Sequence, residues 1–138
     1  SDRKKFEERT KKLIDQYNGY TVVDGTPVNG EFTQGENIGD LAGIVIAYKA
    51  YQLSKKGKEA PEIDGLSGDQ RFFYGWATIW GSKSTDEQLI RQIKTDPHSP
   101  GEFRANGPLV SMPEFLNLYK IKKGDGMYIN PNDRVKIW

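Results

Sequence analysis

The sequence predicts a mainly α-helical fold, and three observations support this prediction. Four apolar or aromatic segments each follow a Ser or Thr that is placed to cap a helix, with Glu or Gln three residues later. One of these segments, residues 33–55, is apolar on almost every side, which is typical of a buried helix. Turn-forming pairs such as Asn-Gly and Asp-Gly lie between the segments.

The composition fits one folded domain and argues against several functional classes. At 138 residues a single domain is expected, with a thin core in which three Trp, seven Tyr and six Phe supply much of the buried area. The formal charge is +1 and the charges are interspersed, which argues against a nucleic-acid or polybasic membrane surface. No run of about 18 apolar residues exists. The lack of cysteine excludes a disulfide scaffold.

The N-terminal part is expected to form a helix followed by a turn-rich connector. Residues 4–17 place apolar side chains on one side of a helix. These side chains are Phe6, Leu13, Ile14 and Tyr17. Residues 18–32 carry three turn-forming pairs, and short strands are expected at residues 21–23 and near Val28.

The helix expected over residues 33–55 carries the most informative pattern in the chain. Thr33 is placed to cap it, and Glu36 stands at the capping-box position. Glu36 and Asp40 lie one turn apart on one face, and such a pair is costly to bury unless a cation meets it. Glu36 has an ordinary explanation as a cap, whereas Asp40 lies past the first turn. The same face continues through three small residues that let another backbone approach: Gly43, Ala47 and Ala50.

Three shorter helices are expected in the second half of the chain. Their capping pairs are Ser67 with Gln70, Thr85 with Gln88, and Ser111 with Glu114. The first of these helices is rich in aromatic residues and is expected to end near Gly81. Residues 96–104 contain two prolines and a glycine, which suits a rigid loop that holds side chains in place. The tail after Gly124 is expected to be irregular.

Two further residues are candidates for a functional site, although each also has an ordinary explanation. His98 is the only histidine, so the chain cannot build a closed zinc site from its own nitrogen and sulfur ligands. A single loop histidine is usually a surface or hydrogen-bonding residue. Arg104 fits an ordinary surface arginine, a partner of a buried carboxylate such as Asp40, or a group that binds a substrate carbonyl. The tryptophans are expected in the core rather than on a sugar-binding platform.

Three segments of the chain resemble motifs of the neprilysin and endothelin-converting enzyme family of zinc metalloendopeptidases. Residues 35–40 (GENIGD), with Gly43 downstream, resemble the motif that carries the family's third zinc ligand. Residues 94–104 (KTDPHSPGEFR) resemble its second signature, and residues 134–138 (RVKIW) are similar to its C-terminus. Residues 6–10 (FEERT) fit as well, so the resemblance covers essentially the whole chain in the right order.

The resemblance implies a fold and a role for each site residue. The fold is the C-terminal helical part of a zincin-like (thermolysin-like) metallopeptidase catalytic domain, with short strands and an irregular C-terminal tail. Glu36 matches the third zinc ligand, and Asp40 matches the acid that orients a zinc-bound histidine. His98 matches the residue that stabilises the oxyanion of the tetrahedral intermediate. Arg104 matches the arginine that binds the substrate backbone and contacts the Asp40 equivalent.

The departures from the family imply an incomplete enzyme. The H-E-x-x-H helix, which supplies two zinc ligands and the catalytic glutamate, is absent, as is the Asn-Ala-Phe/Tyr substrate-binding segment. We therefore expect residues 1–138 to be the C-terminal portion of a catalytic domain that has been truncated at its N-terminus. The complete enzyme is expected to hold one zinc ion, with an incomplete site in this chain. The isolated chain is expected to be inactive.

The resemblance also predicts partners and a location. The expected partners are a peptide substrate and the remainder of the catalytic domain. The metal-binding helix is expected to pack on the face formed by Gly43, Ala47 and Ala50. A face left exposed is expected to allow the isolated chain to dimerise. Vertebrate members carry cysteines in this region, so a bacterial member is favoured, with an extracytoplasmic location that is periplasmic, secreted or membrane-anchored.

Two other functional classes stay open at this point. The first is a stand-alone, non-catalytic peptide-binding or regulatory domain that kept the fold and lost the catalysis, with which a single histidine is equally consistent. The second is a carbohydrate-binding module that uses exposed tryptophans. An in-frame H-E-x-x-H segment upstream of residue 1 distinguishes the peptidase from the first alternative.

Overall fold

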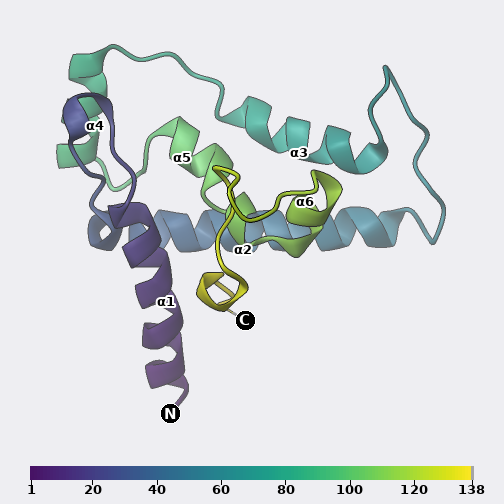
Figure 1. The fold of residues 1–138 in the computed structure, drawn as a ribbon, viewed down its shortest axis with the longest axis horizontal. Coiled ribbons are helices and arrows are strands. Elements are labelled where there is room, and N and C mark those ends of the chain that lie inside the picture. Colours follow the sequence, from purple (N-terminus) through teal and green to yellow (C-terminus); the bar gives the residue numbers. More distant parts are fainter. Residues whose placement is uncertain (138) are drawn as a thin grey trace.

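The structure is a computed structural model that describes residues 1–137, and these residues form six α-helices and three short 3₁₀ segments. The longest helix, α2, runs through the middle of the fold, with α3 alongside its second half and α1 meeting it steeply near its start (Figure 1). The helices are α1 (Asp2–Asn18), α2 (Gly30–Ser54), α3 (Gly68–Ile79), α4 (Asp86–Thr95), α5 (Gly101–Asn106) and α6 (Pro113–Leu118). The 3₁₀ segments are η1 (Val23–Gly25), η2 (Leu109–Ser111) and η3 (Pro131–Asp133). The predicted mainly α-helical fold is confirmed.

Two apolar clusters along α2 form the core. The first lies where α1, the start of α2 and the C-terminal segment meet, and it contains Leu13, Tyr17, Val28, Leu41, Ile93, Val135 and Ile137. The second joins the middle of α2 to α3, η2 and α6, and it contains Ile44, Phe73, Leu109, Met112, Phe115 and Leu116. Because each cluster uses a different stretch of α2, this helix connects the two halves of the core.

The contact between α1 and α2 depends on the first residue of α2. A Cβ atom at Gly30 would overlap the backbone carbonyl oxygen of Ile14, so only glycine allows this close approach. The backbone N–H of Gly30 donates to Asn18 Oδ1 at 2.7 Å, which ties the start of α2 to the end of α1. This contact fixes where α2 begins.

The predicted start of α2 is wrong by one turn, and the correction bears on Glu36. The cap is Asn29, whose side chain accepts a hydrogen bond from the backbone N–H of Phe32 at 2.9 Å. Thr33 lies inside the helix, where its hydroxyl donates to the backbone carbonyl of Asn29. Glu36 is therefore not a capping-box residue, and the ordinary explanation for this carboxylate falls away.

The other predicted caps have mixed outcomes. The capping boxes of α3 (Ser67 with Gln70) and α4 (Thr85 with Gln88) are confirmed, with both reciprocal hydrogen bonds present. The capping box predicted for α6 is wrong, since this helix starts at Pro113 without a side-chain cap. The hydroxyl of Ser111 instead accepts from the backbone N–H of Val135 at 2.9 Å, because the C-terminal segment folds back over it.

Two further predictions are corrected by the described residues, and one residue of a predicted motif lies outside them. The short strands expected at residues 21–23 and near Val28 reduce to one isolated bridge between Thr21 and Pro27. The second half of the expected loop 96–104 forms the short helix α5 instead. The C-terminal residue of the motif over residues 134–138, Trp138, lies outside the described residues. None of the helices over residues 1–137 is long and apolar enough to cross a membrane.

Candidate functional site

Four side chains predicted as site residues meet between α2 and the segment that joins α4 to α5. Glu36 and Asp40 lie one turn apart on α2, His98 lies in the loop before α5, and Arg104 lies in α5. Hydrogen bonds and ion pairs connect all four, although about sixty residues separate the two groups in the sequence. Figure 1 shows α5 lying over the first half of α2. The structure therefore brings together all four candidates.

Asp40 and Arg104 form a buried bidentate pair. Arg104 Nε donates to Asp40 Oδ2 at 2.7 Å, and Arg104 Nη2 donates to Asp40 Oδ1 at 2.8 Å. The side chains are only 9% and 14% exposed, so each charge is compensated where water is scarce. The hydrogen bond to Asp40 raises the pKa of the Arg104 guanidinium, which stays charged. The guanidinium carbon also lies 4.1 Å from the ring centroid of Trp80, which fixes the guanidinium on a second side.

Glu36 is held more loosely than Asp40 and is more accessible. Its Oε2 atom lies 3.3 Å from Arg104 Nη2 and 3.3 Å from His98 Nε2. The Glu36 side chain is 45% exposed, five times the value for Asp40. Two carboxylates on one face of one helix thus have different environments. Asp40 is paired with Arg104 and nearly buried, whereas Glu36 is half-exposed and lies between Arg104 and His98.

His98 is oriented by Asp96, a residue that the sequence analysis did not predict. Asp96 Oδ1 accepts the backbone N–H of His98 at 2.9 Å and lies 2.6 Å from ring Nδ1. The hydrogen bond from the backbone N–H of His98 lowers the pKa of Asp96, and the contact with the His98 ring lowers it further. Because Nδ1 is engaged by this carboxylate, Nε2 is the ring nitrogen that faces Glu36. An Asp two residues before a loop histidine, in a turn, was the available signal.

A buried chain of polar side chains, which was not predicted from the sequence, joins α2 to the His98 loop. Ser99 Oγ donates to Asn37 Oδ1 at 2.9 Å, and Asn37 Nδ2 donates to Thr33 Oγ1 at 2.9 Å. The three residues are at most 2% exposed. Their signal was present in the helix pattern, since Thr33, Asn37 and Asp40 place polar groups on one face of an otherwise apolar helix.

The donor set at this site fits one carboxylate ligand to a metal ion rather than a complete metal site. Carboxylate oxygen is a normal zinc ligand, and Glu36 is accessible enough to supply it. Each oxygen of Asp40 already accepts a hydrogen bond from Arg104, and ring Nδ1 of His98 contacts Asp96. Among residues 1–137, no group of three or more His, Cys, Asp or Glu is placed to hold a metal. A zinc ion at Glu36 needs further ligands from beyond these residues.

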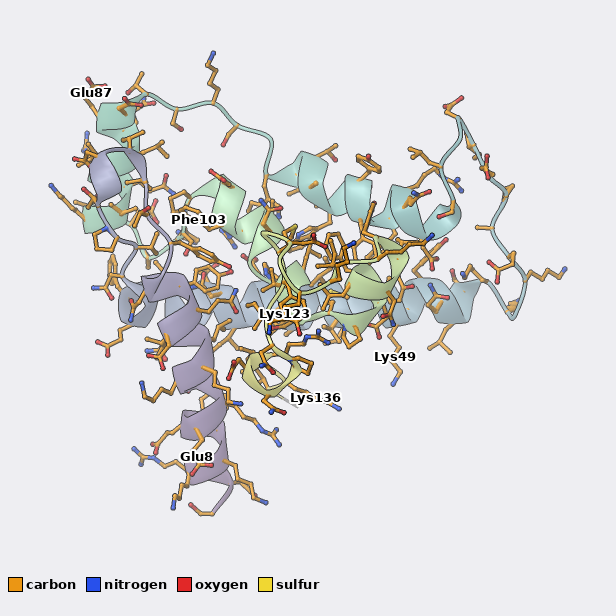
Figure 2. The ribbon with its side chains drawn as sticks, viewed as in Figure 1. Glu8, Lys49, Glu87, Phe103, Lys123 and Lys136 are labelled. Carbon is orange, nitrogen blue, oxygen red and sulfur yellow. The ribbon has the colours of Figure 1, made fainter. Side chains whose placement is uncertain are left out.

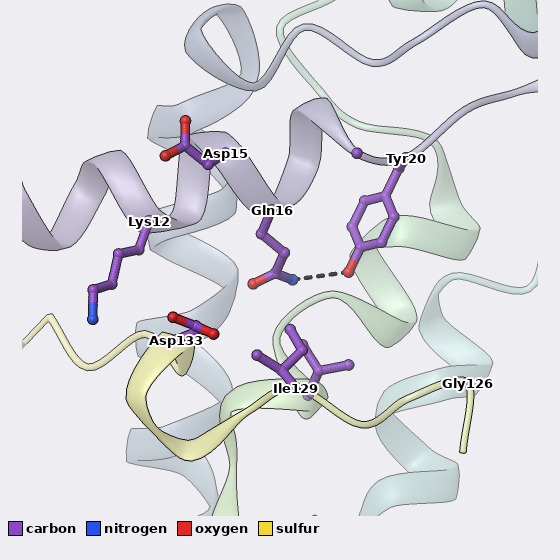
Figure 3. A pocket seen from close by; sticks show the side chains of 9 residues that line it. Lys12, Asp15, Gln16, Tyr20, Gly126, Ile129 and Asp133 are labelled. Atoms are coloured by element: carbon purple, nitrogen blue, oxygen red, sulfur yellow. Dashed lines mark hydrogen bonds between the residues drawn. The ribbon is translucent and has the colours of Figure 1, made fainter. Parts of the chain in front are cut away.

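Two cavities lie away from the four site residues. One, of about 420 Å³, lies between α1 and the C-terminal segment, where Gln16 donates to the hydroxyl of Tyr20 (Figure 3). Another, of about 490 Å³, lies between α2 and the segment around Arg134. None of the four site residues lines either cavity. The candidate site therefore lies outside both of these cavities.

Two of the three tryptophans pack inside the described structure. Trp76 Nε1 donates to the backbone carbonyl of Ala105 at 2.9 Å. The ring of Trp80 contacts Trp76 edge to face and lies against Arg104. Trp76 packs against the second core cluster, which confirms the expected core position for this residue, whereas Trp80 is half-buried beside it and belongs to neither cluster. The structure gives no support to a carbohydrate-binding platform built on them.

The amino-acid sequence is similar to peptidases over nearly its whole length. A family model described as "Peptidase family M13" matches residues 1–135. Endothelin-converting enzyme 1 of Rattus norvegicus is 41% identical over 137 residues, which cover 96% of this chain and 18% of that protein. Neprilysin-1 of Caenorhabditis elegans is 42% identical over 141 residues, which cover 97% of this chain and 18% of that protein.

Solved structures of similar proteins share this fold. A crystal structure of the zinc metalloprotease Zmp1 of Mycobacterium tuberculosis, in complex with an inhibitor, matches with a TM-score of 0.95 at 47% identity. That match covers 99% of this chain and 22% of the Zmp1 chain. PepO from Lactobacillus rhamnosis matches with a TM-score of 0.79 at 29% identity, over 99% of this chain and 20% of that chain. The chain thus spans about one fifth of the length of the proteins it resembles.

Proposed function

Since the chain belongs to peptidase family M13, we propose that it forms the C-terminal portion of the catalytic domain of a zinc-dependent endopeptidase that cleaves small to medium peptides. The observation that carries this proposal is that Glu36, Asp40, His98 and Arg104 contact one another, with Glu36 and His98 half-exposed. The remaining zinc ligands and the catalytic glutamate come from an H-E-x-x-H segment, which residues 1–138 do not contain. On this proposal the isolated chain is inactive.

Glu36 is proposed as the zinc ligand of this chain. Its carboxylate is the half-exposed one of the pair, and the two groups near its Oε2 atom lie at the long distance of 3.3 Å. A ligand exchanging these weak contacts for a metal bond loses little. When bound, zinc supplies Lewis-acid polarisation of a peptide carbonyl and activation of water.

Asp40 is proposed to orient a zinc-ligating histidine of the missing segment. A carboxylate offers about four lone-pair positions, and Arg104 uses one on each oxygen of Asp40. Lone pairs are left to accept an imidazole N–H, which is the usual partner of a metal-bound histidine. The rigid pairing with Arg104 fixes where that acceptor stands.

His98 is proposed to stabilise the negative charge that develops on the substrate carbonyl oxygen. Asp96 holds ring Nδ1, and in a protonated imidazolium Nε2 also carries a proton to donate. Nε2 points to the Glu36 side of the site, where the reacting carbonyl is expected. A fixed charged donor in this place acts on the transition state more than on the ground state.

Arg104 is proposed to bind a backbone carbonyl of the substrate. Its Nε and Nη2 atoms are used by Asp40 and Glu36, while Nη1 makes no hydrogen bond to any described residue. The guanidinium cannot rotate freely because Asp40 holds one edge and Trp80 one face. Nη1 is therefore a positioned donor, and it fixes a peptide relative to Glu36.

The proposal extends to partners and location. The proposed partners are a peptide and the remainder of the catalytic domain, which covers the exposed side of α2. In the isolated chain the same side is proposed to pair two copies, which sedimentation velocity measures directly. An extracytoplasmic location is part of the proposal by analogy with the family, and fractionation of the source cells tests it.

The substitution Glu36→Gln in the full-length enzyme tests the function. It keeps the size of the side chain but removes the anionic ligand, so zinc is expected to be lost and peptide hydrolysis to fall by more than about 100-fold. Metal content by plasma mass spectrometry and turnover of a fluorogenic peptide provide the readouts. The matched control is Glu31→Gln, an exposed acid in the first turn of the same helix, which should keep both. Retained zinc together with full activity in Glu36→Gln overturns the assignment.

A further inference from the structure

Besides the two 3.3 Å contacts of Glu36, two shorter polar contacts connect α2 to the segment that carries His98. One is the buried hydrogen bond between Ser99 and Asn37, and the other is the bidentate pair of Arg104 and Asp40. Asn37 immediately follows Glu36 on α2, just as Ser99 immediately follows His98. The Ser99–Asn37 bond is therefore one residue away from both groups whose separation matters.

The other contacts of His98 do not set its distance from Glu36. Asp96 holds the backbone N–H and the ring, but it belongs to the same short turn. Gln92 of α4 donates to the backbone carbonyl of His98 at 3.2 Å, which ties the turn to α4 rather than to α2. Pro97 and Pro100 stiffen the turn, so it moves as one piece with its imidazole.

The Ser99–Asn37 bond belongs to a chain in which each described donor has an acceptor. The hydroxyl of Ser99 donates to Asn37, the amide of Asn37 donates to Thr33, and the hydroxyl of Thr33 donates to the backbone of Asn29. Ser99 and Asn37 are each 1% exposed, so water does not compete for these groups. A buried network of this kind is specific, because any shift of the loop leaves polar atoms without partners.

We infer that Asn37 and Ser99 are positioning residues that hold the His98 imidazole at its working distance from Glu36. This inference rests on the proposed function, in which Glu36 binds zinc and His98 stabilises the oxyanion. Both side chains are buried, so neither is placed to reach a substrate or a metal ion. Their effect is exerted through His98, since the loop that carries the imidazole is docked on α2 through the Ser99 hydroxyl.

The test is Ser99→Ala in the full-length enzyme, with Ser99→Cys as a milder variant that keeps a weak donor. We expect kcat to fall about tenfold in Ser99→Ala and less in Ser99→Cys, with zinc content unchanged. The matched control is Ser111→Ala, which removes another buried serine hydroxyl whose partner is the backbone of Val135. This control should leave kcat unchanged.

A double-substitution experiment separates positioning from general damage. His98→Ala alone is expected to lower kcat about 100-fold. If Ser99 acts through His98, then Ser99→Ala in the His98→Ala background lowers kcat no further. An undiminished tenfold loss in that background overturns the inference, as does a Ser99→Ala enzyme with unchanged kcat.

A readout that needs no activity uses the 138-residue chain itself. Because His98 is its only histidine, each carbon and nitrogen position of the imidazole gives one signal, which is assigned to His98 directly. Ring ¹³C relaxation is expected to show greater motion in Ser99→Ala than in wild type, and no change in Ser111→Ala. Unchanged ring motion in Ser99→Ala contradicts the inference. If Glu36→Gln keeps zinc and activity, the proposed function fails, whereas failure of the Ser99 tests alone leaves that function standing.

Discussion

At the scale of single residues, the two carboxylates of the candidate site have different environments. Asp40 is 9% exposed and held by two short hydrogen bonds from Arg104, whereas Glu36 is 45% exposed and has only long contacts. A cation therefore competes easily for Glu36 and poorly for Asp40. The difference arises because Asp40 lies one helical turn beyond Glu36 on α2, where it contacts Arg104 of α5 more closely.

The pH dependence of folding tests the role of Asp96. Its pKa is lowered, chiefly because the backbone N–H of His98 donates to the carboxylate. A lowered pKa in the folded state stabilises the fold above the ordinary range of Asp, and this stabilisation is lost as the pH falls through the lowered value. We expect the unfolding free energy of the chain to decline as the pH falls below about 4, and to decline less in Asp96→Asn. Urea titrations at each pH measure the unfolding free energy of both proteins. An equal decline with pH in wild type and Asp96→Asn contradicts the assignment.

The sequence identified the four candidate site residues but not the residues that position them. Glu36 and Asp40 were found because acids on an apolar helix face are unusual, and His98 and Arg104 because their segment resembles a known motif. Asp96 and Ser99 lie in the same segment, but neither residue type is unusual in a loop. Their importance depends on an atom-to-atom match with His98 and with α2, which only the folded chain displays.

At the scale of elements, the start of α2 is set by its contact with α1 rather than by cap chemistry alone. Asn29 and Thr33 are both favourable cap residues, so the sequence offers two starts one turn apart. The close approach at Gly30 selects the earlier one. Helix α5 was missed because six residues are too few to show a periodic pattern. The strand pair was overpredicted because turn signals do not distinguish one bridge from a hairpin.

Gly30→Ala tests the contact between α1 and α2. The added methyl group overlaps the Ile14 carbonyl, so the chain is expected to lose about 1–3 kcal/mol of unfolding free energy. Gly35→Ala is the matched control, since a Cβ atom there meets nothing within 4 Å. That variant is expected to gain about 0.5–1 kcal/mol because alanine favours a helix interior. Urea unfolding of the chain measures both, and a Gly30→Ala variant as stable as wild type contradicts the account.

At the scale of the whole molecule, one side of α2 is left uncovered. Lys49 points away from α3 and α6 in Figure 2, and Gly43, Ala47 and Ala50 are exposed on the described surface. Ile46 and Leu53 are 62% and 70% exposed, which is a large apolar surface for a helix at the centre of a fold. The packing of a metal-binding helix on this side stays a prediction. Such packing would explain both the small residues on this side of α2 and the small size of the core.

The most direct test of the central claim is to locate zinc by anomalous scattering in crystals of the full-length enzyme. We predict a single zinc peak within about 2.0–2.2 Å of a Glu36 carboxylate oxygen. Asp40 should remain paired with Arg104, and His98 Nε2 should face the metal side of the site. A zinc peak bound elsewhere, with Glu36 still contacting only His98 and Arg104, would contradict the account.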